Sequence, residues 1–225
     1  MIKNLLNLFF PEVCNACSNI LLDNELHICT TCRHNLPVTD FHFNNPEFVK
    51  KLFYGNLNLE NATALLRFQK KGITQQLMHN LKYRGQEHIG TVLGKWLGNE
   101  LNSIESYNDI DVVVPVPLHK SKLRKRGYNQ VTKFGQEIAS AFKVDYNDTT
   151  LIKTRSLKTQ VFKKRLARWS AIDEVFDISD SQSLQNKHIL LVDDIITTGA
   201  TMEACANQLN KIPNIKLSIA AMAIA

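Results

Sequence analysis

The chain has 225 residues, of which 44% are hydrophobic and 21% are charged. This composition suits a soluble globular protein with one main core and a small appendage, and it argues against a disordered or repetitive chain. Between Lys120 and Arg168 the sequence has 14 Lys or Arg against three acidic residues, although the whole chain carries a net charge of only +6. These basic residues either bind an anionic partner or lie on the solvent-exposed faces of two helices without a binding role.

The first ten residues are rich in Leu and Phe, but their apolar run is too short for a signal peptide. No small-residue cleavage site follows them. No segment approaches the roughly 20 apolar residues that a membrane-spanning helix needs. We therefore expect a cytoplasmic protein without membrane insertion.

Four of the five cysteines form two C-x2-C pairs separated by eleven residues: Cys14, Cys17, Cys29 and Cys32. Two residues between paired thiols let both sulfurs face inward from one turn, and two such turns complete a tetrahedral zinc site. Disulfides are the alternative, but a reducing cytosol disfavours them. Because the segment is too short for its own apolar core, we expect a structural zinc module at residues 1–40, with His27 and His34 as bystanders.

Beyond the cysteines, residues 41–61 are interpreted as a linker and residues 62–225 as one α/β domain. We expect strands at 62–68, 111–117, 188–192 and 217–225, and helices at 73–101 (interrupted at 83–85), 129–142 and 200–211. Strands that alternate with helices favour a mainly parallel central sheet flanked by helices, with ligands at the carboxyl ends of the strands. Cys205, at an apolar position of the last helix, is expected to be buried rather than nucleophilic.

Residues 189–201 carry the most informative pattern. A buried strand ends in two acids, Asp193 and Asp194, and a loop of small or hydroxylated residues leads directly into a helix. The first N–H groups of a helix lack internal partners and its dipole favours an anion, so we expect this loop to bind a phosphate. The loop residues are Thr197, Thr198, Gly199, Ala200 and Thr201. The acids suit ribose hydroxyls or Mg²⁺ water ligands instead.

The segment is neither a Walker loop nor a dinucleotide fingerprint. The alternative is a strand that ends in a polar turn, with a threonine capping the following helix. At these residues the sequence resembles the type I phosphoribosyltransferases, whose signature is an apolar strand, two acids, two apolar residues and a Thr/Gly loop. The resemblance implies that Asp193 and Asp194 are the catalytic acids and engage the ribose of phosphoribosyl pyrophosphate (PRPP). It also implies that the loop at 197–201 holds the PRPP 5-phosphate.

Other motifs narrow the resemblance. They are LKYRG at 81–85, VPVPLH at 114–119 and RGYNQ at 126–130. Together with the cysteine pairs and residues 189–201, they resemble the ComF family, bacterial proteins linked to competence for DNA uptake. The resemblance covers nearly the whole chain and implies a type I phosphoribosyltransferase fold, while it leaves the reaction open.

The resemblance also assigns roles to the basic segments. Type I enzymes bind pyrophosphate, together with Mg²⁺, on a loop after an early strand, which corresponds here to residues 117–127. The candidate pyrophosphate-binding residues are His119, Lys120, Lys122 and Arg126. In the similar glutamine PRPP amidotransferases, a flexible loop closes over PRPP. Its candidates here are Lys158, Gln160 and Arg165, and an exposed basic helix is the alternative for that segment.

Three functions fit this sequence. The first is Mg²⁺-dependent transfer of a phosphoribosyl group from PRPP to an unidentified acceptor. The second is a non-catalytic role in DNA uptake, in which the same scaffold binds single-stranded DNA or the uptake machinery. The third is a PRPP or nucleotide sensor without turnover. Transfer chemistry requires charge stabilisation more than a nucleophilic residue, and no Ser/His/Asp set is apparent in the sequence.

Overall fold

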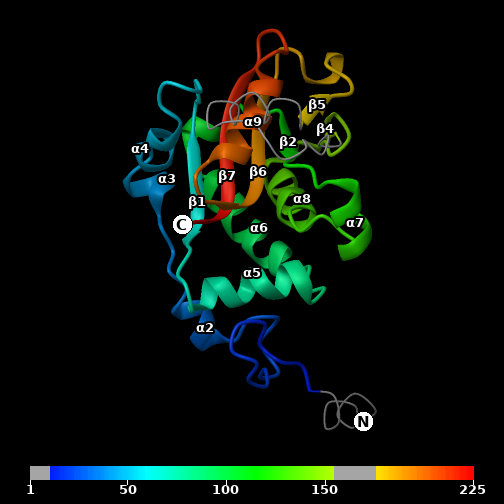
Figure 1. Ribbon diagram of the computed structural model, residues 1–225. Coiled ribbons are helices and arrows are strands. Elements are labelled where there is room, and N and C mark those ends of the chain that lie inside the picture. The colour runs from blue at the N-terminus through cyan, green and yellow to red at the C-terminus, as the bar shows by residue number, and fades with distance from the viewer. Residues whose placement is uncertain (1–10, 155–175) are drawn as a thin grey trace, which may run out of the picture.

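The structure, a computed structural model, describes residues 11–154 and 176–225 (Figure 1). Its first half contains α2 (Thr30–His34), α3 (Phe41–Asn44), α4 (Glu47–Lys50), η1 (Lys51–Phe53), β1 (Ala62–Arg67), α5 (Ile73–Tyr83), α6 (His88–Leu101) and η2 (Glu105–Tyr107). Its second half contains β2 (Val112–Pro115), α7 (Lys120–Arg126), α8 (Thr132–Phe142), β3 (Asp145–Tyr146), β4 (Leu151–Lys153), β5 (Phe176–Ile178), η4 (Gln182–Leu184), β6 (His188–Ile196), α9 (Ala200–Leu209) and β7 (Lys216–Ile224). Across the described ranges, no helix is long and apolar enough to cross a membrane.

A five-stranded sheet forms the centre of the fold, in the order β1-β7-β6-β2-β3, and all of its neighbouring strands are parallel. β6 and β7 are buried along almost their whole length, as expected when both faces of a parallel sheet are covered. β4 and β5 form a separate antiparallel pair. The predicted α/β fold with a mainly parallel central sheet is confirmed.

Helices cover both faces of the sheet because successive strand residues point to opposite sides. On one face, Leu190 and Val192 of β6 belong to the apolar core that includes α5, α6 and α8. On the other face, Ile189 and Leu191 pack in a second core with α9 and the segment from α3 to η1. Figure 1 shows the sheet between these two groups of helices. The site at the carboxyl edge of β6 therefore receives side chains from both layers.

Two parts of the N-terminal region are more integrated than their sequence suggests. Residues 41–61, interpreted as a linker, include α3, α4 and η1, and Val49 and Phe53 are buried in the second core. These one-turn helices are too short to have a visible apolar period. The cysteine module lies beneath α5 (Figure 1), and its Ile28 and Leu36 belong to the same core as Leu81.

Two elements near the acids also differ from expectation. β6 continues to Ile196, so both acids lie within the strand rather than after it. Residues 117–127, expected as a pyrophosphate loop, are mostly the helix α7. Its sequence KSKLRKR contains good helix formers, and Gly127 ends the helix with a φ of +87°, in the left-handed region. The basic side chains of this segment therefore point in several directions around α7 instead of lining one loop.

Candidate functional site

The two predicted acids lie near the carboxyl end of β6, where Asp193 is 8% and Asp194 is 6% exposed. Asp194 faces α5 and the start of α8. Its Oδ1 lies 2.9 Å from Nζ of Lys82, and its Oδ2 accepts a hydrogen bond of 2.6 Å from Nε2 of Gln130. Asp193 interacts electrostatically with Lys82 and, more weakly, with Lys153 of β4, and it also acts on Cys205 of α9. The adjacent acids therefore have different surroundings, as strand alternation requires.

Burial raises the pKa of Asp193 to about 8, and the negative charge of Asp194 adds to the rise. The N–H of Asp194, 2.8 Å from Oδ1 of Asp193, opposes the rise together with the charges of Lys82 and Lys153. Like charges this close are not both favoured in a buried site, so Asp193 keeps its proton near neutral pH. A neutral carboxyl group beside a carboxylate gives the site both a hydrogen-bond donor and acceptors.

We expect Asp193 to make the ligand-free protein less stable as the pH rises from about 4 to about 8. In this window Asp193 keeps its proton in the folded chain but has lost it in the unfolded chain, so stability falls with rising pH. The loss is at most about 1.4 kcal/mol per pH unit. Urea unfolding across this range measures it, and Asp193→Asn should give a shallower decline than the wild type. Equal slopes for the two proteins would contradict the assignment.

The loop after β6 keeps its polar groups open to solvent. Thr197, Thr198, Ala200 and Thr201 are all exposed, and α9 begins at Ala200. Gly199 has a φ of +79°, in the left-handed region that favours glycine. A Cβ atom added there would lie 2.8 Å from Cε1 of Phe53, a residue of the expected linker. Hydroxyl groups and first-turn N–H groups thus meet at a tight turn, an arrangement suited to a phosphate.

The four predicted pyrophosphate residues do not gather on one side of α7. Lys120 lines a cavity of about 290 Å³ together with Lys153. Lys122 and Arg126 line another cavity, of about 310 Å³. Nδ1 of His119 caps α7, where it accepts a backbone hydrogen bond of 3.2 Å. This separation follows from the helix, which turns successive side chains in different directions.

Three residues near the acids were not predicted from the sequence as site residues: Lys82, Gln130 and Lys153. Lys82 and Gln130 lie in the LKYRG and RGYNQ motifs, which supported the resemblance but carried no assigned role. Both motifs meet at Asp194. Lys153 had no sequence signal. Burial lowers its pKa, and its Nζ lies 4.7 Å from the ring centroid of Phe176.

The predicted closing residues Lys158, Gln160 and Arg165 lie outside the described residues, and their role stays a prediction. Cys205 is fully buried, as predicted, and burial raises its pKa well above the usual range. It is therefore unsuited to act as a nucleophile.

A Ser/His/Asp set that the sequence did not reveal is present near the start of β6, far along the strand from the acids. Nδ1 of His188 lies 2.7 Å from Asp109, and its Nε2 lies 2.8 Å from Oγ of Ser218. Ser218 is completely buried, and its Oγ also accepts a hydrogen bond from the N–H of Asn61. These contacts hold together the first residues of β6 and β7 and the segments beside them. Because substrate cannot reach the buried hydroxyl group of Ser218, the set is not a hydrolytic site.

The four cysteines form one cluster, in which all Sγ atoms lie within 4.8 Å of one another. Sγ of Cys17 and Sγ of Cys29 are 3.8 Å apart, close to the roughly 3.8 Å expected for thiolates bound at about 2.3 Å to one tetrahedral zinc. Burial raises the pKa of Cys14, but N–H groups of Cys29 and Ala16, at 3.2 and 3.4 Å, help to lower it to about 7. The donor atoms therefore fit a structural metal such as zinc.

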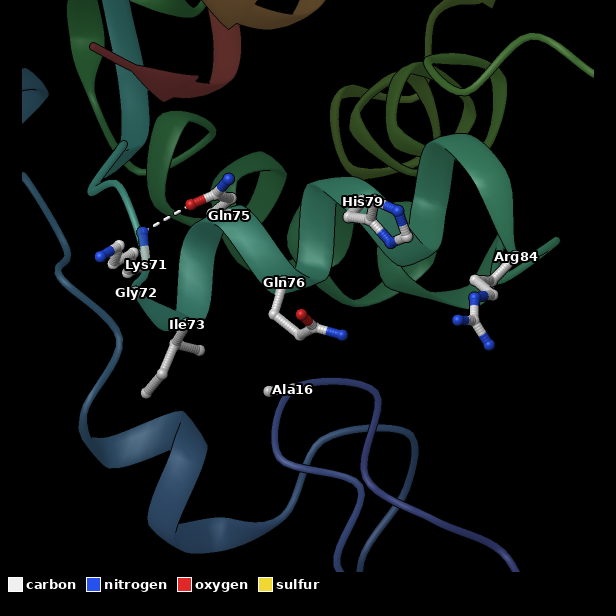
Figure 2. A pocket seen from close by; sticks show the side chains of 8 residues that line it. All are labelled: Ala16, Lys71, Gly72, Ile73, Gln75, Gln76, His79 and Arg84. Carbon is white, nitrogen blue, oxygen red and sulfur yellow. Dashed lines mark hydrogen bonds between the residues drawn. The ribbon is translucent and has the colours of Figure 1, made fainter.

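The cysteine module is attached to the α/β domain at several points. Nδ2 of Asn80 in α5 donates a hydrogen bond of 2.7 Å to the carbonyl of Asn15. The ring of His27, a predicted bystander, stacks on His88 with 4.4 Å between centroids. A cavity of about 590 Å³ lies at this junction. Figure 2 shows its lining residues, which include Ala16 of the module and Gln76 and His79 of α5. The module and the α/β domain are therefore in direct contact at Asn80 and His88, and a cavity separates them at Ala16.

Comparisons with known proteins agree with this architecture. The family described as "Phosphoribosyl transferase domain" matches residues 132–222, which include the acid pair and the hydroxyl loop. DNA utilization protein YhgH of Escherichia coli K12 is 26% identical over 136 residues, 59% of either chain. The chain thus spans about 59% of the length of that relative. Competence protein ComFC of Bacillus subtilis is 25% identical over 196 residues, 87% of this chain and 76% of ComFC.

Among solved structures, glutamine PRPP amidotransferase from B. subtilis, complexed with ADP and GMP, aligns with a TM-score of 0.42 and 18% identity. The alignment covers 63% of this chain and 30% of the amidotransferase. The parallel sheet, the acid pair and the match of residues 132–222 to the phosphoribosyl transferase domain family agree with the predicted type I phosphoribosyltransferase fold. The relatives named here are similar to this chain and are called DNA utilization and competence proteins, which agrees with the predicted resemblance to the ComF family.

Proposed function

We propose that this protein binds PRPP with Mg²⁺ at the carboxyl end of β6 and transfers its phosphoribosyl group to an acceptor. One observation carries the proposal: the buried acids Asp193 and Asp194 lie directly before an exposed hydroxyl loop at the N-terminus of α9. The 5-phosphate would bind to the loop N–H and hydroxyl groups. The acids would bind the ribose hydroxyls.

The pyrophosphate of PRPP would bind beside α7. The cavity that Lys120 and Lys153 share supports this position, because it brings a cation of α7 close to a cation that interacts with Asp193. Lys122 adds to the positive potential there, since its charge also acts on Lys153. Mg²⁺ carried by the pyrophosphate would stabilise the charge of the leaving group.

In the proposed reaction, the acceptor attacks C1 of the ribose while the C1–O bond to pyrophosphate breaks. Pyrophosphate leaves with the electron pair, and positive charge develops on the ribose. The negative charge of the acid pair would stabilise this charge in a buried site, where electrostatic interactions are strong. Lys82 and Gln130 hold the two oxygens of Asp194, so this carboxylate is oriented before the ligand binds.

Calorimetric titration of the full-length protein with PRPP and Mg²⁺ tests the proposal. We expect the variant Asp193→Asn/Asp194→Asn to bind at least about 100-fold more weakly than the wild type, because it removes the negative charge of the buried pair and the carboxyl groups that would bind the ribose hydroxyls. Absence of binding by the wild type, or equal binding by both proteins, would refute it. Acceptor-dependent release of pyrophosphate then separates an enzyme from a PRPP sensor.

We also propose zinc as the metal of the cysteine cluster and the cytoplasm as the location, because reduced thiols are needed to bind it. A second candidate function is binding of single-stranded DNA, in keeping with the names of the relatives. The exposed cations Lys122, Arg124 and Lys125 of α7 favour it. DNA binding through phosphates would weaken steeply with salt, so affinity measured over a range of salt concentrations tests it.

A further inference from the structure

A cavity of about 310 Å³ lies between the end of α5 and α7, and one of its lining residues, Lys82, contacts Asp194. Its main lining residues are Lys82, Tyr83, Lys122, Lys125, Arg126 and Tyr128. Four of these are cations and two are tyrosines, and the described lining contains no acidic residue. A cavity of this size suits a small organic ligand rather than a single ion.

The walls of this cavity are held by contacts that lead to Asp194. The guanidinium group of Arg126 lies over the ring of Tyr83, 5.6 Å from its centroid, and also donates a hydrogen bond to Oε1 of Gln130. Gln130 donates in turn to Asp194, and Lys82 contacts the same carboxylate from α5. The cavity is therefore connected directly to the acid that would face the ribose of PRPP.

We propose that this cavity is the acceptor subsite, and that the acceptor is a planar nitrogen ring carrying a carboxylate or phosphate group. This inference rests on the proposed function. Lys82 is paired with Asp194, but among the described residues no ion pair involves Lys122, Lys125 or Arg126. A neutral ring would leave these three cations without a counter-charge, whereas an anionic ring gains charge-assisted hydrogen bonds from them. Tyr83, which is 70% exposed, and Tyr128 offer flat surfaces for the ring.

The reaction that this subsite supports is N-ribosylation. A ring nitrogen forms a bond to C1 of PRPP, the C1–O bond breaks, and pyrophosphate departs with the electron pair. A ring N–H that attacks loses its proton to the departing pyrophosphate or to water, while a pyridine-type nitrogen has no proton to lose and keeps a positive charge in the product. The products are the ring N-linked to ribose 5-phosphate and free pyrophosphate.

Two matched pairs of probes test the charge requirement: orotate against uracil, and nicotinate against nicotinamide. Binding of each probe to the full-length protein with Mg²⁺ is measured by calorimetry or ligand-observed NMR. We expect the carboxylated member of at least one pair to bind at least about tenfold more tightly than its neutral partner. Equal affinities within both pairs, or no binding of any probe, would overturn the proposal.

The variant Lys125→Met tests whether the preference for carboxylated probes arises in this cavity. Lys125 is exposed, so its loss should not disturb folding, and it lies outside the residues proposed for PRPP. We expect this variant to bind the carboxylated probe at least about fivefold more weakly and to bind PRPP normally. Lys133→Met, which removes an exposed lysine of α8 outside the cavity, is the matched control. Unchanged probe binding by Lys125→Met would reject this site, whereas failure of the proposed function appears separately as absent PRPP binding.

Discussion

Cys14→Ser is expected to abolish zinc binding and to lower the free energy of unfolding by more than about 4 kcal/mol. Cys14 is only 1% exposed, and its Sγ accepts hydrogen bonds from the N–H groups of Ala16 and Cys29. Serine cannot replace it as a ligand, because zinc is bound by a thiolate and a serine hydroxyl stays protonated. The effect should spread beyond the module. Ile28 of the module packs in the same core as Leu81, and α5 also carries Lys82, the partner of Asp194.

Zinc content by elemental analysis and unfolding by urea measure this effect. Cys205→Ala is the matched control, because it removes a buried thiol outside the cysteine cluster. It should retain about one zinc per chain and lose only about 1–2 kcal/mol of stability. Zinc retention by Cys14→Ser, or equal destabilisation of the two variants, would count against a structural metal at these cysteines.

Gly199→Ala is expected to destabilise the protein by about 2–5 kcal/mol and to weaken PRPP binding by at least about tenfold. A φ of +79° costs a residue with a Cβ about 1–2 kcal/mol. The new Cβ would lie 2.8 Å from Cε1 of Phe53, a ring that is 1% exposed and cannot move aside freely. This overpacking adds about 1–3 kcal/mol. If the chain relieves the backbone strain at position 199 or the contact with Phe53, the loop that would bind the 5-phosphate has to move, and binding weakens.

A double-mutant cycle with Phe53→Leu separates the two causes. The smaller side chain should remove most of the steric cost of Gly199→Ala but none of its backbone cost, so the two changes should not be additive. Urea unfolding of the four proteins, together with PRPP titration, provides the measurement. Strict additivity would mean that Phe53 does not constrain the loop.

Much of this protein is visible in the sequence because the relevant signals are local. The two C-x2-C pairs predicted the cysteine cluster, since two residues between thiols suffice to turn both sulfurs inward. The apolar runs predicted β6 and β7, because strands covered on both faces must be apolar along their length. The acid pair and its hydroxyl loop could be predicted for the same reason: strand, loop and helix are contiguous in the chain.

Contacts between distant segments were decided only by the tertiary structure. The pairing of Lys82 with Asp194 joins positions 112 residues apart, and no local pattern encodes it. The packing of Phe53 against Gly199 likewise needs the sheet to bring η1 beside the start of α9. The different environments of Asp193 and Asp194 arise because each face of β6 meets a different layer of helices. The sequence by itself therefore determined which groups the site contains, whereas the packing of the two layers decided which neighbours set the charge of each acid.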